Sequence, residues 1–211
     1  MGRIRDLLNR LFYAIGANVI SLIVSVMTTF FIPKFLGEKV EQYGYYQIYI
    51  FYTGYIGFFH LGWSDGIILR DGGKRYEDLD KPLYSSQFWL LTLFEGFVSA
   101  GILISGLIFS ANQDYLFIFF AVALTVLIYL PRTQLTYYLQ ATNRIKEYAV
   151  ITALCRLLFG ISIILIVLFG KPDYKLFILG DLCGKLIALL VSMWICKDIV
   201  KTRPVILSVA I

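Results

Sequence analysis

Long apolar stretches and short polar connections alternate along the whole chain. Six of the stretches carry few or no charges, and each is close to the roughly 20 residues that an α-helix needs to cross the apolar part of a bilayer. Only helices and closed barrels satisfy their backbone hydrogen bonds inside lipid, and these stretches are longer than barrel strands. The pattern therefore predicts an all-α, polytopic membrane protein with six transmembrane helices, at residues 11–31, 42–62, 86–109, 115–139, 148–169 and 176–196.

The composition agrees with this prediction. Hydrophobic residues make up 59% of the chain and aromatic residues 17%, and the mean hydropathy is +0.75, which together are too apolar for a soluble domain. The first apolar stretch follows a basic N-terminus, as in a signal peptide, but it is longer than a signal peptide's apolar region and no small-residue cleavage site follows it. We therefore expect this stretch to be kept as a membrane span.

Lysine and arginine residues collect on alternate connections between the predicted spans. Such an excess marks the cytoplasmic side, so the pattern predicts both termini inside the cell and a multi-pass protein of the cytoplasmic (inner) membrane. The chain then divides into a basic N-terminus at 1–10, a six-helix lobe at 11–196 and a basic segment at 197–211. The predicted cytoplasmic group is Arg3, Arg5, Arg10, Arg70, Lys74, Arg75, Lys81, Arg132, Arg144, Lys146, Lys197, Lys201 and Arg203, and the opposite group is Lys34, Lys39, Lys171 and Lys175.

The formal net charge of +5 does not indicate nucleic-acid binding. The basic residues sit in short connections beside apolar spans and form no sustained basic stripe on a soluble domain. Anionic lipid headgroups are the expected counter-charge for residues in such positions. The lipid bilayer is therefore the first expected partner.

Residue types that build catalytic or metal sites are sparse. The three cysteines fall in or at the ends of predicted spans, and their spacing matches no zinc motif. The chain has a single histidine, His60, so a histidine-rich metal site is excluded. His60 is set among aromatic residues. The only acidic cluster, at 77–80, is mixed with lysine and arginine, as in a solvated loop. We expect no metal, no cofactor and no catalytic residue, and the chain is not expected to be an enzyme.

Three charged residues lie deep inside predicted spans: Glu95, Arg156 and Lys185. Each is about eight or nine residues from the start of its span, which places it roughly 12 to 15 Å deep. An ionised group at that depth costs on the order of 2.5 to 3.5 kcal/mol, so such groups face a bundle interior or a water-filled cavity. We therefore expect these residues to face inward.

Two interpretations of these charges are open. Asp181 stands four residues before Lys185, so the two can form an ion pair within one helix. Glu95 and Arg156 can pair between helices in the same way, and for Glu95 this structural role is favoured. In the other interpretation, Arg156 and Lys185 keep a positive field in a central cavity for an anionic substrate, and Glu95 couples transport to protonation or ion binding.

The most specific motifs lie between the first and third predicted spans. A Pro-x-x-Leu-Gly turn occupies 33–37, Tyr-Gly-Tyr at 43–45 opens the second span, and Leu-Gly at 61–62 is followed by Arg70. In this order the motifs resemble the opening of oligosaccharide flippases of the polysaccharide-biosynthesis family, the family of the O-antigen flippases. That family belongs to the multidrug, oligosaccharidyl-lipid and polysaccharide exporter superfamily, and the resemblance covers its N-terminal half.

The resemblance implies an exporter that moves a polyprenyl-diphosphate-linked sugar unit from the cytoplasmic to the outer leaflet by alternating access, without covalent chemistry. A diphosphate headgroup needs cationic partners inside the membrane because its desolvation is costly. Arg156 and Lys185 are the leading candidates to bind it. Arg70 either receives the headgroup at the cytoplasmic mouth or anchors the loop that follows it.

Such exporters have about twice as many helices, arranged as two lobes around the cavity. Six helices make one lobe, so a second six-helix lobe is an expected partner. Residues 204–211 begin a new apolar run that soon stops, and we interpret the chain as a fragment. The alternatives are a membrane-embedded glycosyltransferase or acyltransferase, an accessory subunit, a small drug exporter or a channel.

Overall fold

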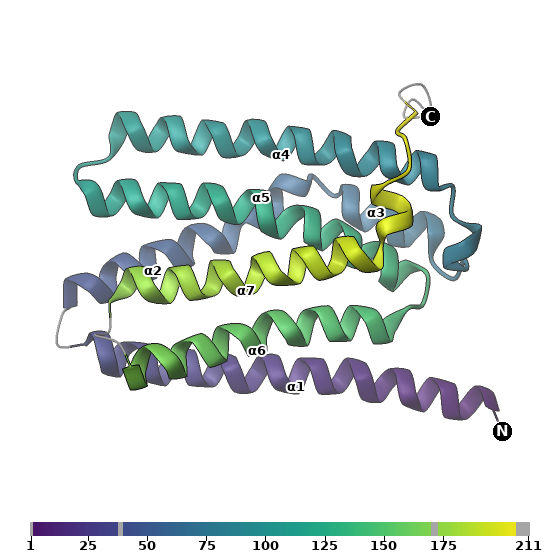
Figure 1. The fold of residues 1–211 in the computed structure, drawn as a ribbon, viewed down its shortest axis with the longest axis horizontal. Coiled ribbons are helices and arrows are strands. Elements are labelled where there is room, and N and C mark those ends of the chain that lie inside the picture. The colour runs from purple at the N-terminus through teal and green to yellow at the C-terminus, as the bar shows by residue number, and fades with distance from the viewer. Residues whose placement is uncertain (1, 38–39, 170–172, 206–211) are drawn as a thin grey trace.

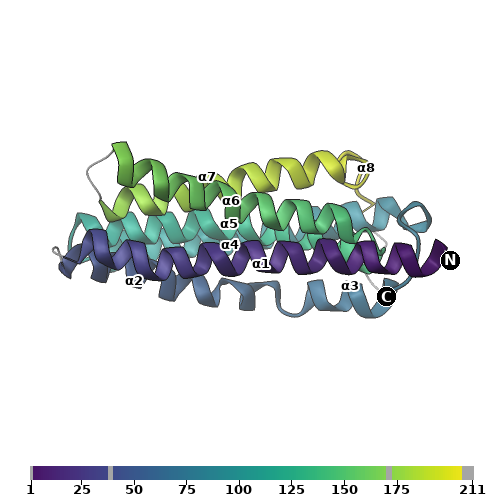
Figure 2. The same cartoon turned by 90° about the horizontal axis from the view of Figure 1, so that it is seen from below.

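The computed structural model describes residues 2–37, 40–169 and 173–205, with side chains from Leu11 onward. Within these ranges every regular element is a helix, and the long helices lie side by side along one common direction (Figure 1). Residue 2 and residue 205 lie at the same end of the bundle in both cartoon views (Figures 1 and 2). The expected all-α fold is confirmed.

Five helices in the described part of the chain are long and apolar enough to cross a membrane. The shortest, α7, has 22 residues and is about 33 Å long. Together they confirm the predicted spans at 11–31, 86–109, 115–139, 148–169 and 176–196 as continuous apolar helices of spanning length. These helices are α1 (Gly2–Leu36), α4 (Lys81–Phe109), α5 (Gln113–Ala141), α6 (Ile145–Phe169) and α7 (Tyr174–Ile195).

The predicted span at 42–62 is not one continuous helix. Helix α2 (Val40–Tyr55) has 16 residues and is about 24 Å long, which is shorter than the apolar part of a bilayer. A 3₁₀ helix, η1 (Ile56–His60), follows, and then Leu61 and Gly62 adopt left-handed backbone angles, with φ of 50° and 76°. A right-handed helix cannot include two such residues, so the chain restarts as α3 (Trp63–Asp71).

The observed helix ends also differ from the predicted ones. Helix α4 begins at Lys81, where the Asp80 carboxylate caps it by accepting a hydrogen bond from the Leu83 amide at 3.2 Å. Helix α5 continues through Pro131 to Ala141. Placing Arg132 in a cytoplasmic connection is therefore wrong, because this residue lies inside α5. Two short helices complete the described chain, η2 (Tyr76–Asp78) and α8 (Lys197–Val200).

Helix α5 is the central element of the bundle. It packs against α4, α7, α3 and α2, while α1 packs on α6 and α6 on α7. Figure 2 shows α2 and α3 along one face of the bundle and α7 and α8 along the opposite face. Two apolar clusters form the core, one around Tyr49 and Phe177 and one around Tyr138 and Leu139. Because α5 contributes to both clusters, it holds the two halves of the bundle together.

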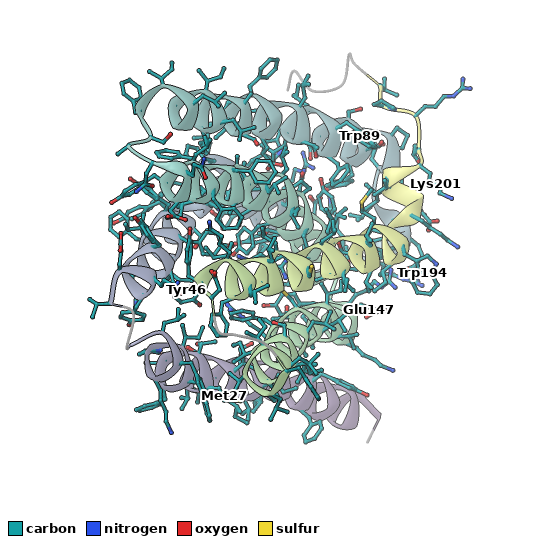
Figure 3. The ribbon with its side chains drawn as sticks, turned by 60° about the vertical axis from the view of Figure 1, so that its left-hand side comes forward. Met27, Tyr46, Trp89, Glu147, Trp194 and Lys201 are labelled. Carbon is teal, nitrogen blue, oxygen red and sulfur yellow. The ribbon has the colours of Figure 1, made fainter. Side chains whose placement is uncertain are left out.

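The segment after α7 is tied to the beginning of α4. Trp89 donates from Nε1 to the Val200 carbonyl at 3.2 Å, and Ser85 donates from Oγ to the Thr202 carbonyl at 2.6 Å. Figure 3 shows Trp89 and Lys201 at this same end of the bundle. The new apolar run expected from residue 204 onward falls mostly on residues 206–211, outside the described part of the chain.

Substitutions at two glycines of α4 test the close packing of α4 on α5. A Cβ atom at Gly106 would lie 2.5 Å from the Cβ of Phe119, whereas a Cβ atom at Gly101 would meet no atom within 4 Å. We expect Gly106→Ala to lower the free energy of unfolding by about 1–3 kcal/mol through overpacking. Gly101→Ala should leave it unchanged or raise it, because alanine favours the helix. Thermal unfolding of both variants in detergent is the measurement, and equal effects would contradict this packing.

Candidate functional site

A polar cavity of about 890 Å³ lies between the helices. It is open to the surface, since several lining residues, such as Ser25, Gln47 and Arg156, are exposed. Side chains from α1, α2, α5, α6 and α7 line it, and they include Arg132, Arg156, Asp181 and Lys185. Most other buried side chains of the protein are apolar. The charges of three long helices therefore meet at one place in a bundle of membrane-length helices.

The cavity wall on α5 follows a helical spacing in the sequence. Its polar residues recur three or four positions apart, which places them on one face of the helix. They are Thr125, Tyr129, Arg132, Thr133, Thr136 and Gln140. The spacing of this stripe can be read from the sequence, but a search for apolar stretches misses it because the mean hydropathy of the span is high.

The wall on α2 has the same origin. Tyr43, Tyr46 and Gln47 are three or four positions apart, and Ile50 and Gly54 continue the face. These residues overlap the Tyr-Gly-Tyr motif at 43–45, which the sequence analysis uses only as a family signature. The structure adds a physical role, since this motif opens a helix that lines the cavity.

Two arginines reach the cavity without a counter-charge. Within the described part of the chain, neither Arg132 nor Arg156 forms an ion pair with a carboxylate. The Arg132 guanidinium lies over the Tyr129 ring, with 5.0 Å from its central carbon to the ring centroid, and its buried Nε has no hydrogen-bond partner. Arg156 lines the cavity from α6 and is exposed there, not buried in the bundle interior. Both cations are therefore available to an anion.

The third cation of the cavity, Lys185, is already engaged. Its Nζ forms an ion pair with Asp181 on the same helix, as the i,i+4 spacing predicts. The Tyr49 hydroxyl donates to the same carboxylate oxygen at 2.7 Å, and it also lies 3.1 Å from the Thr125 hydroxyl. These contacts connect α7 to α2 and α5. Because the Asp181 charge is offset by Lys185, the cavity as a whole is positive.

Glu95 is not part of this cavity. Its side chain is fully buried on α4, and neither carboxylate oxygen has a hydrogen-bond partner among the described residues. Ser99, one turn further on, donates to the Ala123 carbonyl of α5 at 3.0 Å, so this face of α4 is turned toward α5. The expected pairing of Glu95 with Arg156 is wrong, because α4 and α6 lie on different sides of α5 and α7 (Figure 1).

Arg70 is also outside the cavity. Its Nε donates to Asp71 at 3.1 Å, and its guanidinium lies 5.2 Å from the centroid of the Tyr84 ring. Lys74 and the Tyr84 hydroxyl also donate to the Asp71 carboxylate, which is almost completely buried. This arrangement fits the loop-anchoring alternative for Arg70, since the side chain holds α3 to the beginning of α4.

Other candidate chemistry is dispersed over the described residues. The acidic cluster at 77–80 does not form a site, because Asp80 caps α4 and Glu77 lies 3.6 Å from Arg75 at the exposed surface. No group of three or more histidine, cysteine, aspartate or glutamate side chains suited to a metal ion occurs there. The cavity is therefore the strongest candidate site in the described part of the chain.

The Asp71 cluster yields a prediction about acid stability. Burial raises the pKa of Asp71, but the hydrogen bonds from Lys74, Tyr84 and Arg70 outweigh it and hold the pKa below its ordinary range. A lowered pKa adds stability that is complete above the ordinary pKa and disappears as the pH falls through the lowered one. We expect Asp71→Asn to lower the melting temperature at pH 7, by a margin that shrinks in acid.

The matched control is Asp78→Asn, which changes an exposed carboxylate of η2. Melting curves of both variants from pH 7 downward are the measurement. A margin for Asp71→Asn that grows in acid, or an equal effect of the two substitutions at pH 7, would contradict the stabilising role of the buried carboxylate.

Comparisons with known proteins identify no relative of this chain. No family model matches the sequence, and neither a curated protein nor a solved structure matches it. What the chain does must be inferred from its own residues and their geometry.

Proposed function

We propose that this protein is the N-terminal lobe of a transporter that moves a polyprenyl-diphosphate-linked oligosaccharide across the cytoplasmic membrane. The observation that carries the proposal is the presence of two arginines without carboxylate partners among the described residues, Arg132 and Arg156, in an open polar cavity between membrane-length helices. A charge kept in such a place without a partner marks a ligand or ion pathway. An anionic ligand supplies the missing partner.

Arginine suits a diphosphate better than other cationic side chains do. Its planar guanidinium donates two parallel hydrogen bonds to a phosphate group, and it stays charged when buried. Arg132 and Arg156 come from different helices, α5 and α6, so they can approach a diphosphate from two directions. Their contacts offset the desolvation of a multiply charged headgroup.

The rest of the cavity suits the sugar part of the substrate. Tyrosine, threonine and glutamine side chains supply aromatic faces and hydrogen-bonding groups along the wall, among them Tyr43, Gln47, Tyr137 and Gln140. A few placed polar groups among aromatic side chains are typical of small-molecule sites. The motifs that resemble oligosaccharide flippases, at 33–37 and 43–45, lie on or beside the elements that form this wall.

The distribution of charge supports the orientation with both termini in the cytoplasm. The described connections at the end that holds residues 2 and 205 carry most of the described surface lysines and arginines. Trp89 and Trp194 lie toward this end (Figure 3), as expected for side chains at a membrane interface.

We propose that α2 and η1 together form the remaining crossing, the one expected at 42–62, in two pieces. Irregular backbone is tolerated at membrane depth where it lines a cavity, and broken helices commonly form the binding sites of transporters. Gly54 and Gly57, at the end of α2 and in η1, line the cavity here. A second lobe would then close the cavity from the other side during alternating access.

Arginine substitutions test the function. We expect Arg156→Gln and Arg132→Gln each to slow the flipping of a fluorescent polyprenyl-diphosphate oligosaccharide in proteoliposomes about tenfold or more, because each removes a charge-assisted contact worth about 1.5–3 kcal/mol. Arg75→Gln is the matched control, since Arg75 is exposed outside the cavity. The full reading frame that contains this chain should be used.

Several outcomes would contradict the proposal. Unchanged flipping in both cavity variants would remove the role of the arginines. Sugar transfer without flipping would indicate a membrane-embedded transferase, and unsaturable flux of small ions would indicate a channel.

A further inference from the structure

Among the described residues that line the cavity, Asp181 is the only carboxylate, and a chain of hydroxyl groups leads away from it. Tyr49 Oη lies 2.7 Å from Asp181 Oδ2 and 3.1 Å from Thr125 Oγ1, and Thr125 donates to the Ala121 carbonyl at 2.8 Å. Tyr49 is fully buried, and Asp181 and Thr125 are almost so. The chain joins α7, α2 and α5.

The hydrogens in this chain can be arranged in two ways. Thr125 uses its one hydrogen on Ala121, and Tyr49 has one hydrogen for two neighbours. If Asp181 is ionised, Tyr49 donates to it and the contact between Tyr49 and Thr125 lacks a hydrogen. If Asp181 is protonated, it donates to Tyr49, Tyr49 donates to Thr125, and every contact carries a hydrogen. The geometry therefore accommodates both protonation states of Asp181.

Lys185 decides which arrangement is stable. Its Nζ pairs with Asp181 and lies 3.4 Å from Tyr49 Oη. The ammonium sits on a flexible four-carbon stem, and Lys185 also lines the cavity, so it can turn toward an anion bound there. An ionised Asp181 would then remain buried without its counter-charge, which is unfavourable.

Other helices also bring polar, charged and titratable groups toward the Asp181 side of the cavity. Tyr46 and Tyr49 come from α2, Arg156 lines the same cavity from α6, and the neighbour on α5, Thr125, does not titrate. Figure 3 shows Tyr46 between α2 and α7. Lys185 pairs with the Asp181 carboxylate, and Arg156 adds to the positive charge of the same cavity. An anion that engages both cations offsets this positive charge.

We infer that Asp181 is a proton-binding site whose occupancy is linked to the anion in the cavity. When the anion draws Lys185 away, the Asp181 carboxylate takes one proton from the aqueous phase and forms an O–H bond. Binding linkage is reciprocal, so a protonated Asp181 also strengthens anion binding. This inference rests on the anion site proposed above, and it gives that site a coupling to protons.

The test counts protons during ligand binding. Geranyl diphosphate is titrated by calorimetry into the protein in lipid nanodiscs, in buffers of different ionisation enthalpy, for wild type and Asp181→Asn. The titration of the ligand itself contributes equally to both. We expect wild type to take up about one proton more per ligand than the variant, and its affinity to rise up to about tenfold per pH unit relative to the variant as the pH falls.

Infrared difference spectra give a second readout that a purely structural role would not move. Wild type should gain the C=O band of a protonated carboxyl group when ligand is added, and Asp181→Asn should not. Lys185→Met should show this band before ligand is added and should take up no further proton. Glu147→Gln, which changes a carboxylate paired with Arg144 outside the cavity, should behave like wild type.

The outcomes separate the two claims. Ligand binding with equal proton uptake in wild type and Asp181→Asn would overturn the proton site and leave the anion site standing. Absence of geranyl diphosphate binding to folded wild type would overturn the anion site and, with it, the linkage. A Lys185→Met spectrum without the protonated band would contradict the role of Lys185.

Discussion

A charge placed among membrane-length helices must find a counter-charge, a proton or water, and this requirement organises the polar part of the protein. Asp181 and Lys185 meet it within one helix, with Tyr49 as a further donor. Arg132, which is half-buried, and Arg156, which is exposed where it lines the cavity, have no carboxylate partner in the described chain. The cavity exists where these charges meet, and its positive balance makes an anion the natural ligand.

The apolar side chains that pack the bundle and the polar side chains that line the cavity lie on different faces of the helices. Helix α5 contributes apolar side chains to both core clusters and a polar stripe to the cavity, so one helix serves stability and function on different faces. Close approach of α4 at Gly106 and anchoring of α3 through Asp71 lie away from the cavity. Substitutions that act on stability and those that act on ligand binding are therefore expected to separate.

Hydropathy was sufficient for most of the fold, because five spans are continuous apolar helices. It could not reveal the break after Tyr55, since left-handed backbone at Leu61 and Gly62 leaves the hydropathy of the segment unchanged. It also assigned Arg132 to a connection, because a charge beside Pro131 resembles a helix end. The depth of a charge was readable from the sequence, whereas its partners depend on which helices are neighbours.

In the candidate site, too, local features could be predicted from the sequence and contacts between helices could not. The i,i+4 spacing of Asp181 and Lys185 is local, so the sequence sufficed to predict their pair. The position of Glu95 against α5, away from Arg156, depends on helix order in space, which the spacing within a span does not encode. The polar stripes on α2 and α5 were visible as three- and four-residue spacings. Only the structure shows that both stripes line the same cavity.

The most direct test of a positive, water-accessible cavity is the rate at which charged thiol reagents reach Thr152→Cys, in a chain whose native cysteines are replaced by serine. Thr152 lines the cavity on α6, whereas Val150 is exposed on the outer surface of the same helix. Relative to their rates with a free thiol, an anionic reagent should label Thr152→Cys faster than a cationic one, and Val150→Cys in a bilayer should show no such preference. Absence of labelling at Thr152→Cys, or faster labelling by the cationic reagent, would contradict a cationic cavity in this protein.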